Sequence, residues 1–594
     1  RAVMDELLEY GIYLALLVAL AIPLSGYINK VMAGERVAVL SRVLVPVENV
    51  VYRCIRVDRA DVMGWKRYLI SALAFSALSL VGLFAILMLQ GVLPGNPEGL
   101  PGLTWDLAFN TAVSFVTNTN WQAYSGESAL SYFSQAIGLT VQNFVTPAVG
   151  MAVLFALFRG LVSEGAPGLG NFFVDVTRSV LFVLIPLALV VTVVDVWQGS
   201  PQNVSEYQEV QLLEPVGIDA EGNVVEADDP AAVQVIDEGV VPMGPQASQV
   251  AIKQLGTNGG GYNGVNSASA LENPTPLTNL VQCISLLLIP FALVFSFGRF
   301  VADRRQGRAI FAAMFVVLVA SLAVIAFFEQ VGTPQLAADG SVYMGTYDQS
   351  GGNMEGKEAR FGVTDSSLWA AFTTAASNGA VNSMHDSYTP IGGMVPIILM
   401  GLGEIIGGGI GCGLYGMIGF VILTVFIAGL MVGRTPEYLG KKIGPKEMRM
   451  ATILCITTPM VLLIGAAVMC LDPATVDSLN NAGAHGFSEV LYAATSAGGN
   501  NGSAFAGFNA NTPMINVVLG FEMLANRFIP LAATLVLAGS LCARPKVAVS
   551  AGTLSTSNAM FVFLLILVVL LVGALSMFPA LALGPIAEQL HMVL

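Results

Sequence analysis

Ten long apolar runs constrain the fold of this chain more than any other feature of its sequence. A helix that crosses a bilayer needs ~20 largely apolar residues. Of the 594 residues, 55% are hydrophobic and 11% are charged, whereas about 25% of the residues in soluble domains are charged. We therefore predict an all-α polytopic membrane protein with ten spans, at about residues 7–28, 66–90, 130–158, 172–196, 277–300, 308–329, 394–432, 449–471, 512–542 and 557–580.

Four shorter, largely apolar segments lie between these runs, at residues 105–116, 247–255, 367–376 and 487–498. Each is followed by a loop with a small polar residue, then Asn, then Gly or Thr. The loops are Thr117-Asn118-Thr119, Thr257-Asn258-Gly259, Ser377-Asn378-Gly379 and Asn500-Asn501-Gly502, and their central Asn residues are 140, 120 and 123 positions apart. This spacing indicates one unit repeated four times, although each loop taken alone is also compatible with an ordinary turn.

The short segments are predicted to be half-length helices that enter the membrane and turn back. Irregular backbone at membrane depth is tolerated only inside protein or beside a water-filled pore. Each such helix directs the negative end of its dipole toward the following loop. Four converging loops would offer backbone carbonyls and hydroxyls to a dehydrated cation, and glycine permits the backbone angles that such a site needs.

The repeat predicts four membrane–pore–membrane units with one extra helix at each end. We assign residues 61–160 to the first unit, 161–302 to the second, 303–440 to the third and 441–545 to the fourth. Residues 1–60 would form the N-terminal helix and the first cytoplasmic loop. Residues 546–594 would form the C-terminal helix.

Basic residues predict the orientation of the chain. All 26 Lys and Arg residues fall in loops on one side, except Arg1, Lys253, Lys357, Arg360 and the intramembrane Arg527. By the positive-inside rule that side is cytoplasmic. Both termini and all four polar loops would then face outward.

Two of the predicted outer loops are long, at about residues 198–246 and 330–365. The first has no Lys or Arg and ten acidic residues: Glu206, Glu209, Glu214, Asp219, Glu221, Glu226, Asp228, Asp229, Asp237 and Glu238. Such a charge run is usually a solvated surface. The alternative is a field that concentrates cations near the mouth of the pore and fades with ionic strength.

The seventh apolar run is too long for one uninterrupted span. It contains a glycine cluster that either allows close helix packing or breaks the helix into a loop beneath the polar loops, and the number of glycines favours the break. Glu404 lies just before the cluster, where an intramembrane carboxylate is either functional or a protonated hydrogen-bonding group. The candidate gate and tunnel residues are Glu404, Gly407, Gly408, Gly409, Gly411 and Gly413.

Other polar residues give fewer constraints. Glu522 and Arg527 are five residues apart, which is poor spacing for a pair within one helix; Arg527 either faces protein, water or a partner, or reaches the membrane interface. The six cysteines form no CxxC pair, and His385, His485 and His591 are scattered. Neither a disulfide framework nor a zinc site is therefore predicted.

Several stretches resemble the KdpA family, the potassium-binding subunits of the Kdp potassium-pumping P-type ATPase. They extend over nearly the whole chain and include VTNTNWQAYSGE (116–127), GTNGGG (256–261), MHDSYTPIGGMVP (384–396), FIAGLMVGRTPEYLGKKI (426–443), HGFSEVLYA (485–493) and NNGSAFAG (500–507). The resemblance implies the fold of the superfamily of K⁺ transporters, with the four polar loops as the K⁺ filter. Gln122, just beyond the first loop, is expected to tune affinity.

The resemblance also implies partners and a location. A catalytic subunit, KdpB, would hydrolyse ATP and receive the ion through an intramembrane tunnel, with the single-span subunit KdpC and a small peptide subunit, KdpF, in the complex. The sequence has neither a DKTG motif nor a GxxxxGK[ST] loop, so we expect no ATP site here. The lipid environment would be a bacterial or archaeal cell membrane, and no nucleic-acid partner is expected.

Some features depart from the family pattern or leave alternatives open. Tyr262-Asn263 stands where a pair of aromatic residues is usual, and Asn378 where other members can carry Cys. A channel-like Trk or Ktr type transporter shares the four-unit design and is the main alternative. A transporter coupled to sodium or protons is a third class, for which Glu404 alone is thin support.

Overall fold

The computed structural model describes residues 2–165, 168–220, 224–333, 351–431, 433–547 and 554–593. Ten helices or helix combinations in these ranges are long and apolar enough to cross a membrane, as predicted. They are α1 (Ala2–Ala33), α3 (Trp65–Leu89), η2 with α6 (Ser134–Leu139, Thr140–Val162), α7 with η3 and α8 (Phe172–Arg178, Ser179–Leu184, Ile185–Gln198), α10 (Pro276–Phe300), α11 (Arg304–Val331), α15 (Cys412–Met431), α16 (Pro445–Leu471), α19 (Pro513–Cys542) and α20 (Ala559–Leu583).

Short buried helices lie between successive spans. These are α4 (Trp105–Val116), α9 (Gln246–Leu255), α13 (Gly362–Ala375) and α18 (Gly483–Gly499), and nearly all of their residues are buried. A further short helix, α14 (Pro390–Gly401), precedes α15. The order long helix, short helix, long helix therefore occurs four times, with α1 before the first set and α20 after the last.

Burial separates central helices from peripheral ones. In its most apolar window, α6 with η2 is 83% buried and α10 is 78% buried, whereas α1, α3 and α20 are each 22% buried. The central helices surround the short helices α4, α9, α13 and α18, which places the polar loops at the middle of the molecule.

The smaller elements are α2 (Ala38–Ile55), α5 (Gly126–Ala129), α17 (Pro473–Asp477), α21 (Pro585–Val593), η1 (Gln90–Val92), η4 (Asn266–Ala268) and η5 (His385–Ser387).

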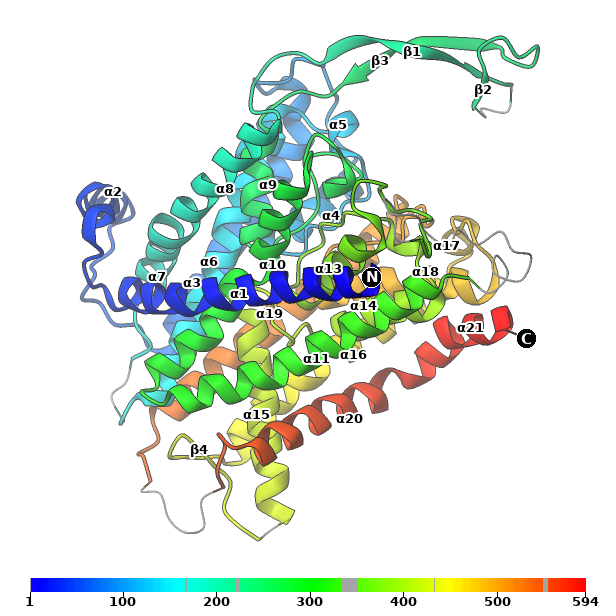
Figure 1. Ribbon diagram of the computed structural model, residues 1–594. Helices are drawn as coiled ribbons and strands as arrows, with labels where there is room; N and C mark the ends of the chain where they lie inside the picture. Colours follow the sequence, from blue (N-terminus) through cyan, green and yellow to red (C-terminus); the bar gives the residue numbers. More distant parts are fainter. Residues whose placement is uncertain are drawn as a thin grey trace.

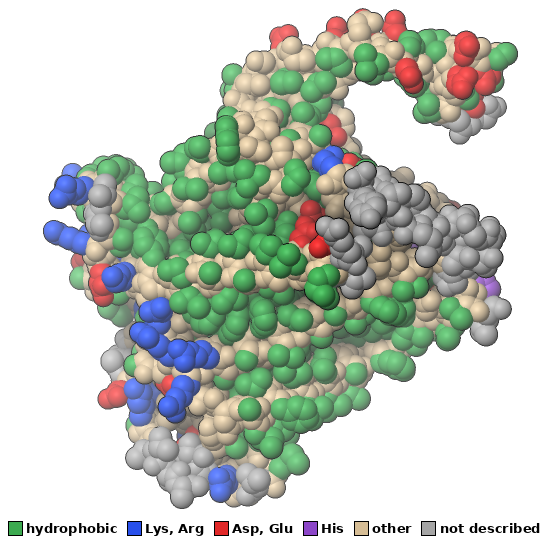
Figure 2. Space-filling model, viewed as in Figure 1, with side chains coloured by type: hydrophobic (Ala, Val, Ile, Leu, Met, Phe, Trp, Pro, Cys, Tyr) green, Lys and Arg blue, Asp and Glu red, His purple; other side chains and the backbone are tan. Residues whose placement is uncertain are grey.

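The acidic segment between α8 and α9 forms a sheet, which the sequence did not predict. Strands β1 (Gln208–Ile218), β2 (Val224–Glu226) and β3 (Gln234–Val241) pair antiparallel in the order β2-β1-β3. The sheet projects from the helical body as an arm (Figure 1), and acidic side chains gather on it (Figure 2). Glu221 lies outside the described residues. A second, very short pair, β4 (Glu437–Tyr438) and β5 (Lys441–Lys442), lies on the opposite side.

Charge is segregated along the direction of the long helices. Lys and Arg side chains gather at one end of the molecule in Figure 2, and Figure 1 places both chain termini toward the other end. Two of the exceptions noted in the sequence are neutralised: Lys253 pairs with Glu272 and Lys357 with Glu329 in fully buried ion pairs. Arg527 is also buried.

The C-terminal helix is held by a histidine between two carboxylates. His485, in the first turn of α18, lies 3.1 Å through Nε2 from Asp386 Oδ1 and 2.8 Å through Nδ1 from Glu588 Oε1 of α21. A ring that donates from both nitrogens is an imidazolium. Hydrogen bonds to Asp386 and Glu588 raise the pKa of His485 to about 10, from its ordinary value of 6.5. The charged ring therefore links the fourth short helix, the third unit and α21.

Replacing His485 with Gln should lower stability in a pH-dependent way. Because folding raises the pKa of His485, its stabilising effect is complete below pH 6.5 and is lost as the pH rises through about 10. A hydrogen bond to a charged group contributes about 1.5–3 kcal/mol. The thermal melting temperature in detergent should thus differ most between the wild type and His485→Gln at pH 6. His591→Gln, at an exposed position in α21, is the control, and an equal difference at pH 6 and pH 10.5 would contradict this role.

Candidate functional site

The four polar loops share one backbone geometry directly after their short helices. Each contains a non-glycine residue in the left-handed region, and in each the next residue donates its N–H to the carbonyl five positions earlier in the helix. The left-handed residues are Asn118 (φ 66°), Thr257 (φ 49°), Ser377 (φ 56°) and Asn500 (φ 60°). Such angles are uncommon outside glycine, so their recurrence at four equivalent points identifies a repeated structure.

This geometry corrects the alignment of the first loop by one residue. Asn118, not Thr117, corresponds to Thr257, Ser377 and Asn500. Thr117 closes α4 with φ −89° and donates its hydroxyl to Val113 O at 2.9 Å. The structurally equivalent triplets are thus Asn118-Thr119-Asn120, Thr257-Asn258-Gly259, Ser377-Asn378-Gly379 and Asn500-Asn501-Gly502. The sequence pattern missed Asn120 because it matched the letters T-N-T.

The third residues of the triplets close the loops into a ring. A Cβ on Gly259 would lie 2.0 Å from Gly379 N, a Cβ on Gly379 would lie 2.5 Å from Gly502 C, and a Cβ on Gly502 would lie 2.0 Å from Thr119 O. The fourth contact is a hydrogen bond, in which Asn120 Nδ2 donates to Gly259 O at 3.1 Å. Glycine is therefore required at three of the four positions, because the neighbouring backbones touch there.

Side-chain hydrogen bonds connect three of the four neighbouring pairs of loops. Asn118 Nδ2 donates to Thr257 O at 2.7 Å, and Ser377 Oγ donates to Asn500 O at 2.9 Å. Asn500 Nδ2 donates to Thr119 Oγ1 at 2.9 Å. Buried networks of this kind, with partners on separate segments, fix their members rigidly.

Two second-position asparagines reach the ends of neighbouring short helices. Asn378 Nδ2 donates to Lys253 O of α9 at 2.9 Å, and Asn501 Nδ2 donates to Thr373 O of α13 at 3.0 Å. The last carbonyls of a helix lack partners within the helix. Each of these two carbonyls also accepts a backbone N–H from its own loop, that of Asn258 or Asn378, so the amide is a second donor that ties its loop to the preceding unit.

Backbone carbonyls at the second and third positions of the triplets are mostly unoccupied; at the third position, no donor among the described residues reaches the oxygens of Asn120, Gly379 or Gly502. Within the described part of the chain, no donor reaches the backbone oxygens of Thr119, Asn258 or Asn501, whereas the Thr373 hydroxyl donates to Asn378 O. An unpaired buried carbonyl costs free energy comparable to a lost hydrogen bond. A cation that accepts these oxygens as ligands would remove that cost.

A cavity of about 700 Å³ opens above the ring. All four units line it, through the residues that follow each loop, including Gln122, Gly260, Val381 and Ser503. Gln122 makes a reciprocal pair with Gly261 across the cavity wall: Nε2 donates to Gly261 O at 3.0 Å and Oε1 accepts from Gly261 N at 2.8 Å. Gln122 therefore connects the first and second units at the mouth.

A buried ion pair supports the second loop from behind, and sequence reasoning missed it. Lys253 Nζ pairs with Glu272 and also donates to Gly260 O at 3.0 Å. Glu272 Oε1 accepts from Asn263 N at 2.7 Å. Tyr262 is 1% exposed, and its hydroxyl end lies against Gly244. The Tyr262-Asn263 pair thus replaces two aromatic residues with one ring and one hydrogen-bonded amide.

The seventh apolar run is broken beneath the ring, as predicted. Helix α14 ends at Gly401 and α15 begins at Cys412. In between, four glycines have positive φ: Gly403, Gly407, Gly408 and Gly411. The break contacts the loops directly, since Gly408 N donates to Ala375 O at 2.8 Å and Ile410 N donates to Thr257 Oγ1 at 3.0 Å.

The intramembrane charges lie in different places around this break. Glu404, itself at φ 50°, accepts from Asn501 Nδ2 at 2.7 Å, so it contacts the ring. Arg527 is 4% exposed in the middle of α19 and donates to Thr146 O at 3.4 Å, so it faces protein and not the membrane interface. Glu522 packs against Gly465, and neither of its oxygens has a hydrogen-bond partner within the described residues.

Among solved structures, the crystal structure of the potassium transporter TrkH from Vibrio parahaemolyticus has a TM-score of 0.48 and 13% identity, covering 87% of this chain and 96% of that chain. This likeness is too weak to support further argument.

Relatives named "Potassium-transporting ATPase potassium-binding subunit" are far more similar. The proteins from Clostridium botulinum (strain Alaska E43 / Type E3), Desulfovibrio desulfuricans and Listeria monocytogenes serotype 4b (strain F2365) are 61%, 59% and 55% identical, over 99%, 98% and 98% of this chain and 100%, 98% and 98% of their own lengths.

A family model describes the same relationship over almost the full length. The model of KdpA, described as "Potassium-transporting ATPase A subunit", matches residues 11–590. That range contains all four loops of the ring and the break beneath them. The chain belongs to the KdpA family, the A subunits of potassium-transporting ATPases.

Proposed function

We propose that this chain is the potassium-binding subunit of an ATP-driven K⁺ uptake pump, and that the four-loop ring is its selectivity filter. The observation that carries the proposal is the closed ring with unoccupied carbonyls at its second position, on Thr119, Asn258 and Asn501. Carbonyl rings replace the hydration shell of K⁺ in selective filters. The names of the relatives, which specify potassium binding, agree with this chemistry.

Residues in and around the ring would hold its shape. The third-position glycines and Asn120 fix the distance between loops, and Lys253 with Glu272 holds the second loop from behind. Thr117 supports the first loop through its hydroxyl, which lies 2.7 Å from Thr119 Oγ1.

Transport would require partners. ATP hydrolysis would take place on a separate catalytic subunit, KdpB, because this sequence has neither a DKTG motif nor a GxxxxGK[ST] loop. KdpC and KdpF would complete the assembly. The complex would lie in a bacterial or archaeal cell membrane with the basic end inside and both termini outside, so that the filter loads from the outer cavity.

The break between α14 and α15 would keep the ion from passing straight through. Gly408 and Ile410 attach it to the third short helix and the second loop, and Glu404 attaches it to the fourth loop. A pump needs such a block, since channel flux far exceeds pump turnover. The ion would then leave sideways, toward the catalytic subunit.

The ring glycines provide the first test. In Gly502→Ala the new Cβ would lie 2.0 Å from Thr119 O, and φ is +106°. We expect the K⁺ concentration for half-maximal ATPase activity of the complex to rise at least about tenfold, or ~1.4 kcal/mol, with Na⁺ and Rb⁺ competing more strongly. Gly483→Ala is the matched control, because Gly483 also has positive φ (+71°) but nothing lies within 4 Å of its Cβ position. An unchanged K⁺ response in Gly502→Ala would refute the assignment.

Gln122 provides a second test, which asks whether this residue affects K⁺ affinity by supporting the loop structurally or through the charge at its position. Because its amide both donates to and accepts from Gly261, neither Arg nor Glu reproduces both hydrogen bonds. Both Gln122→Arg and Gln122→Glu should therefore weaken K⁺ affinity, with Arg worse because it adds positive charge near the path. The measurement is K⁺-stimulated ATPase activity across K⁺ concentrations. Tighter K⁺ binding in Gln122→Glu would show that charge, and not the link to Gly261, sets affinity.

The block provides a third test. Deleting Gly408 to Gly411 removes the hydrogen bonds to Ala375 and Thr257 and should permit ATP-independent K⁺ flux into proteoliposomes. The intact chain should be nearly silent in the same assay. Thr257→Val is the comparison, because it removes one of these two contacts and leaves the loop at full length. It shows whether the flux arises because the loop no longer obstructs the path or because the filter has been loosened. Appreciable passive flux through the intact chain would favour a channel-like transporter.

A further inference from the structure

Helix α2 differs from every span in its orientation. It follows α1 at the basic end of the molecule, and Figure 1 shows it nearly end-on, whereas α1, α11 and α20 run across the view. An ion pair fixes it to the body, since Glu48 of α2 lies 3.2 Å from Arg178 Nε. A helix roughly perpendicular to the spans, at the level where α1 ends, lies along the plane of the membrane surface.

The two sides of α2 have different surroundings. Ser41, Glu48 and Tyr52 are buried against the protein. Away from it, Val43, Val47 and Val50 are 64%, 44% and 56% exposed, and Cys54 is exposed as well. These four residues recur at spacings of four, three and four, which places them on one face of a helix. An apolar face left uncovered next to membrane spans indicates contact with acyl chains.

Arginines border this apolar face. Arg42, Arg53 and Arg56 are all exposed on α2 or at its end. Within the described residues, none of them has a carboxylate partner. Other arginines at the same end are paired: Arg159 with Asp175 and Arg544 with Glu447. Unpaired guanidinium groups beside an apolar helix face match the charge of anionic lipid headgroups.

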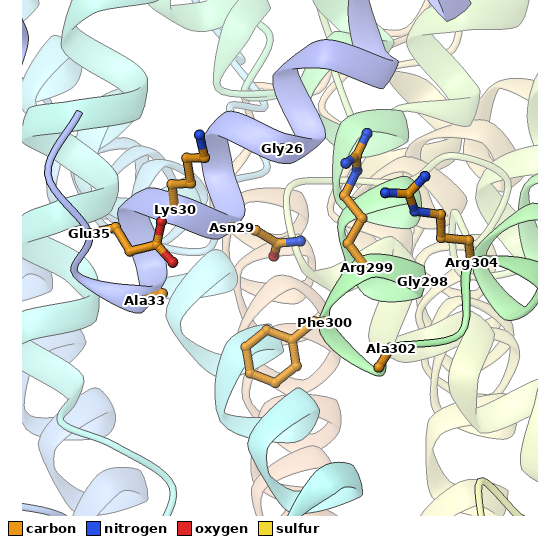
Figure 3. Close-up of a pocket in the computed structure, with 10 residues that line it drawn as sticks. All are labelled: Gly26, Asn29, Lys30, Ala33, Glu35, Gly298, Arg299, Phe300, Ala302 and Arg304. Atoms are coloured by element: carbon orange, nitrogen blue, oxygen red, sulfur yellow. The ribbon is translucent and has the colours of Figure 1, made fainter. Parts of the chain in front are cut away.

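A cavity of about 530 Å³ lies between the ends of α1 and α10, and Glu35, in the segment that joins α1 to α2, is part of its lining. Figure 3 shows Lys30, Arg299 and Arg304 around it, from the ends of three elements. Arg299 is held in place, because its Nε donates to Ser25 Oγ at 2.9 Å. Among the described residues, Lys30, Arg299 and Arg304 have no ion-pair partner within 4.0 Å. Glu35 is the acidic residue in the lining.

We propose that α2 and this cavity form a binding site for anionic phospholipids. The valine face of α2 would lie among the acyl chains, while Arg42 and Arg53 contact headgroups at the surface. The cavity would hold a phosphate group between Lys30, Arg299 and Arg304, because basic pockets between membrane spans suit anionic headgroups. The site is separate from the ion ring, so it does not rest on the proposed K⁺ chemistry.

The position of α2 can be tested with Cys54. The full chain, with the exposed Cys470 changed to Ser, would carry a fluorescent label on Cys54 and be reconstituted in nanodiscs with brominated phospholipid. The bromine atoms should quench the label strongly, and aqueous iodide should quench it weakly. Strong quenching by iodide and none by brominated lipid would place α2 in water and overturn the proposal.

The cavity can be tested by lipid retention. The wild-type chain, in the complex with which it purifies, should retain phosphatidylglycerol or cardiolipin in preference to phosphatidylcholine in native mass spectrometry. In the double variant Lys30→Gln with Arg304→Gln, retention should fall about tenfold or more, because each basic residue near a charged surface contributes roughly 1 kcal/mol. The double variant Lys446→Gln with Arg449→Gln removes equal charge from exposed positions at the start of α16 and should retain lipid as the wild type does.

Two outcomes would overturn the site. Equal loss of lipid in both double variants would show that overall positive charge, and not this cavity, holds the lipid. Inorganic phosphate provides the other: if millimolar phosphate displaced the lipid from the wild type as effectively as phosphatidylglycerol does, the cavity would be a site for soluble anions. Melting temperatures of all variants in zwitterionic detergent verify that each chain is folded.

Discussion

The structure depends on direct backbone contact between four loops that are far apart in sequence. At three of the contacts a Cβ on the glycine would lie 2.0–2.5 Å from the neighbouring backbone. Backbone groups brought together without side chains between them leave carbonyls that no donor among the described residues reaches, as at Thr119 and Asn501. The surrounding helices have to supply the rigidity that such an arrangement lacks, and this explains why the short helices are almost wholly buried.

Buried charge is used around the ring in a consistent way. Lys253 with Glu272 and Lys357 with Glu329 lie in separate units, and each pair also accepts or donates backbone or hydroxyl hydrogen bonds. A buried ion pair is weak evidence for added stability, since desolvation offsets the attraction. Its use here is positional: Lys253 lies in α9 and Lys357 lies shortly before α13, and each lysine is joined to a carboxylate on another segment.

Much of this architecture follows from periodicity and composition. The lengths of the apolar runs predicted ten spans, and the glycines of residues 407–413 predicted the broken helix, because both depend on local sequence. The alignment of the first loop was wrong by one residue, since letters alone do not reveal where α4 ends. The arm formed by β1–β3 was also missed: its strands are exposed on both faces in many positions, so hydrophobic alternation gives little signal. The partners of Lys253 and Gln122 depend on tertiary contacts that no spacing rule contains.

Asn120 shows what a filter made from one chain can do that a symmetric assembly cannot. In a ring of four identical subunits, a side-chain amide introduced at the third position would occur four times and crowd the axis. Here it occurs once, where it bonds to Gly259 O and Asn143 Oδ1, while the other three positions stay glycine. One of the four loops is thereby held by a side chain and the other three by backbone contact. Each loop can then be altered by mutation independently, so that the rigidity of the ring and its ion preference can change in separate steps.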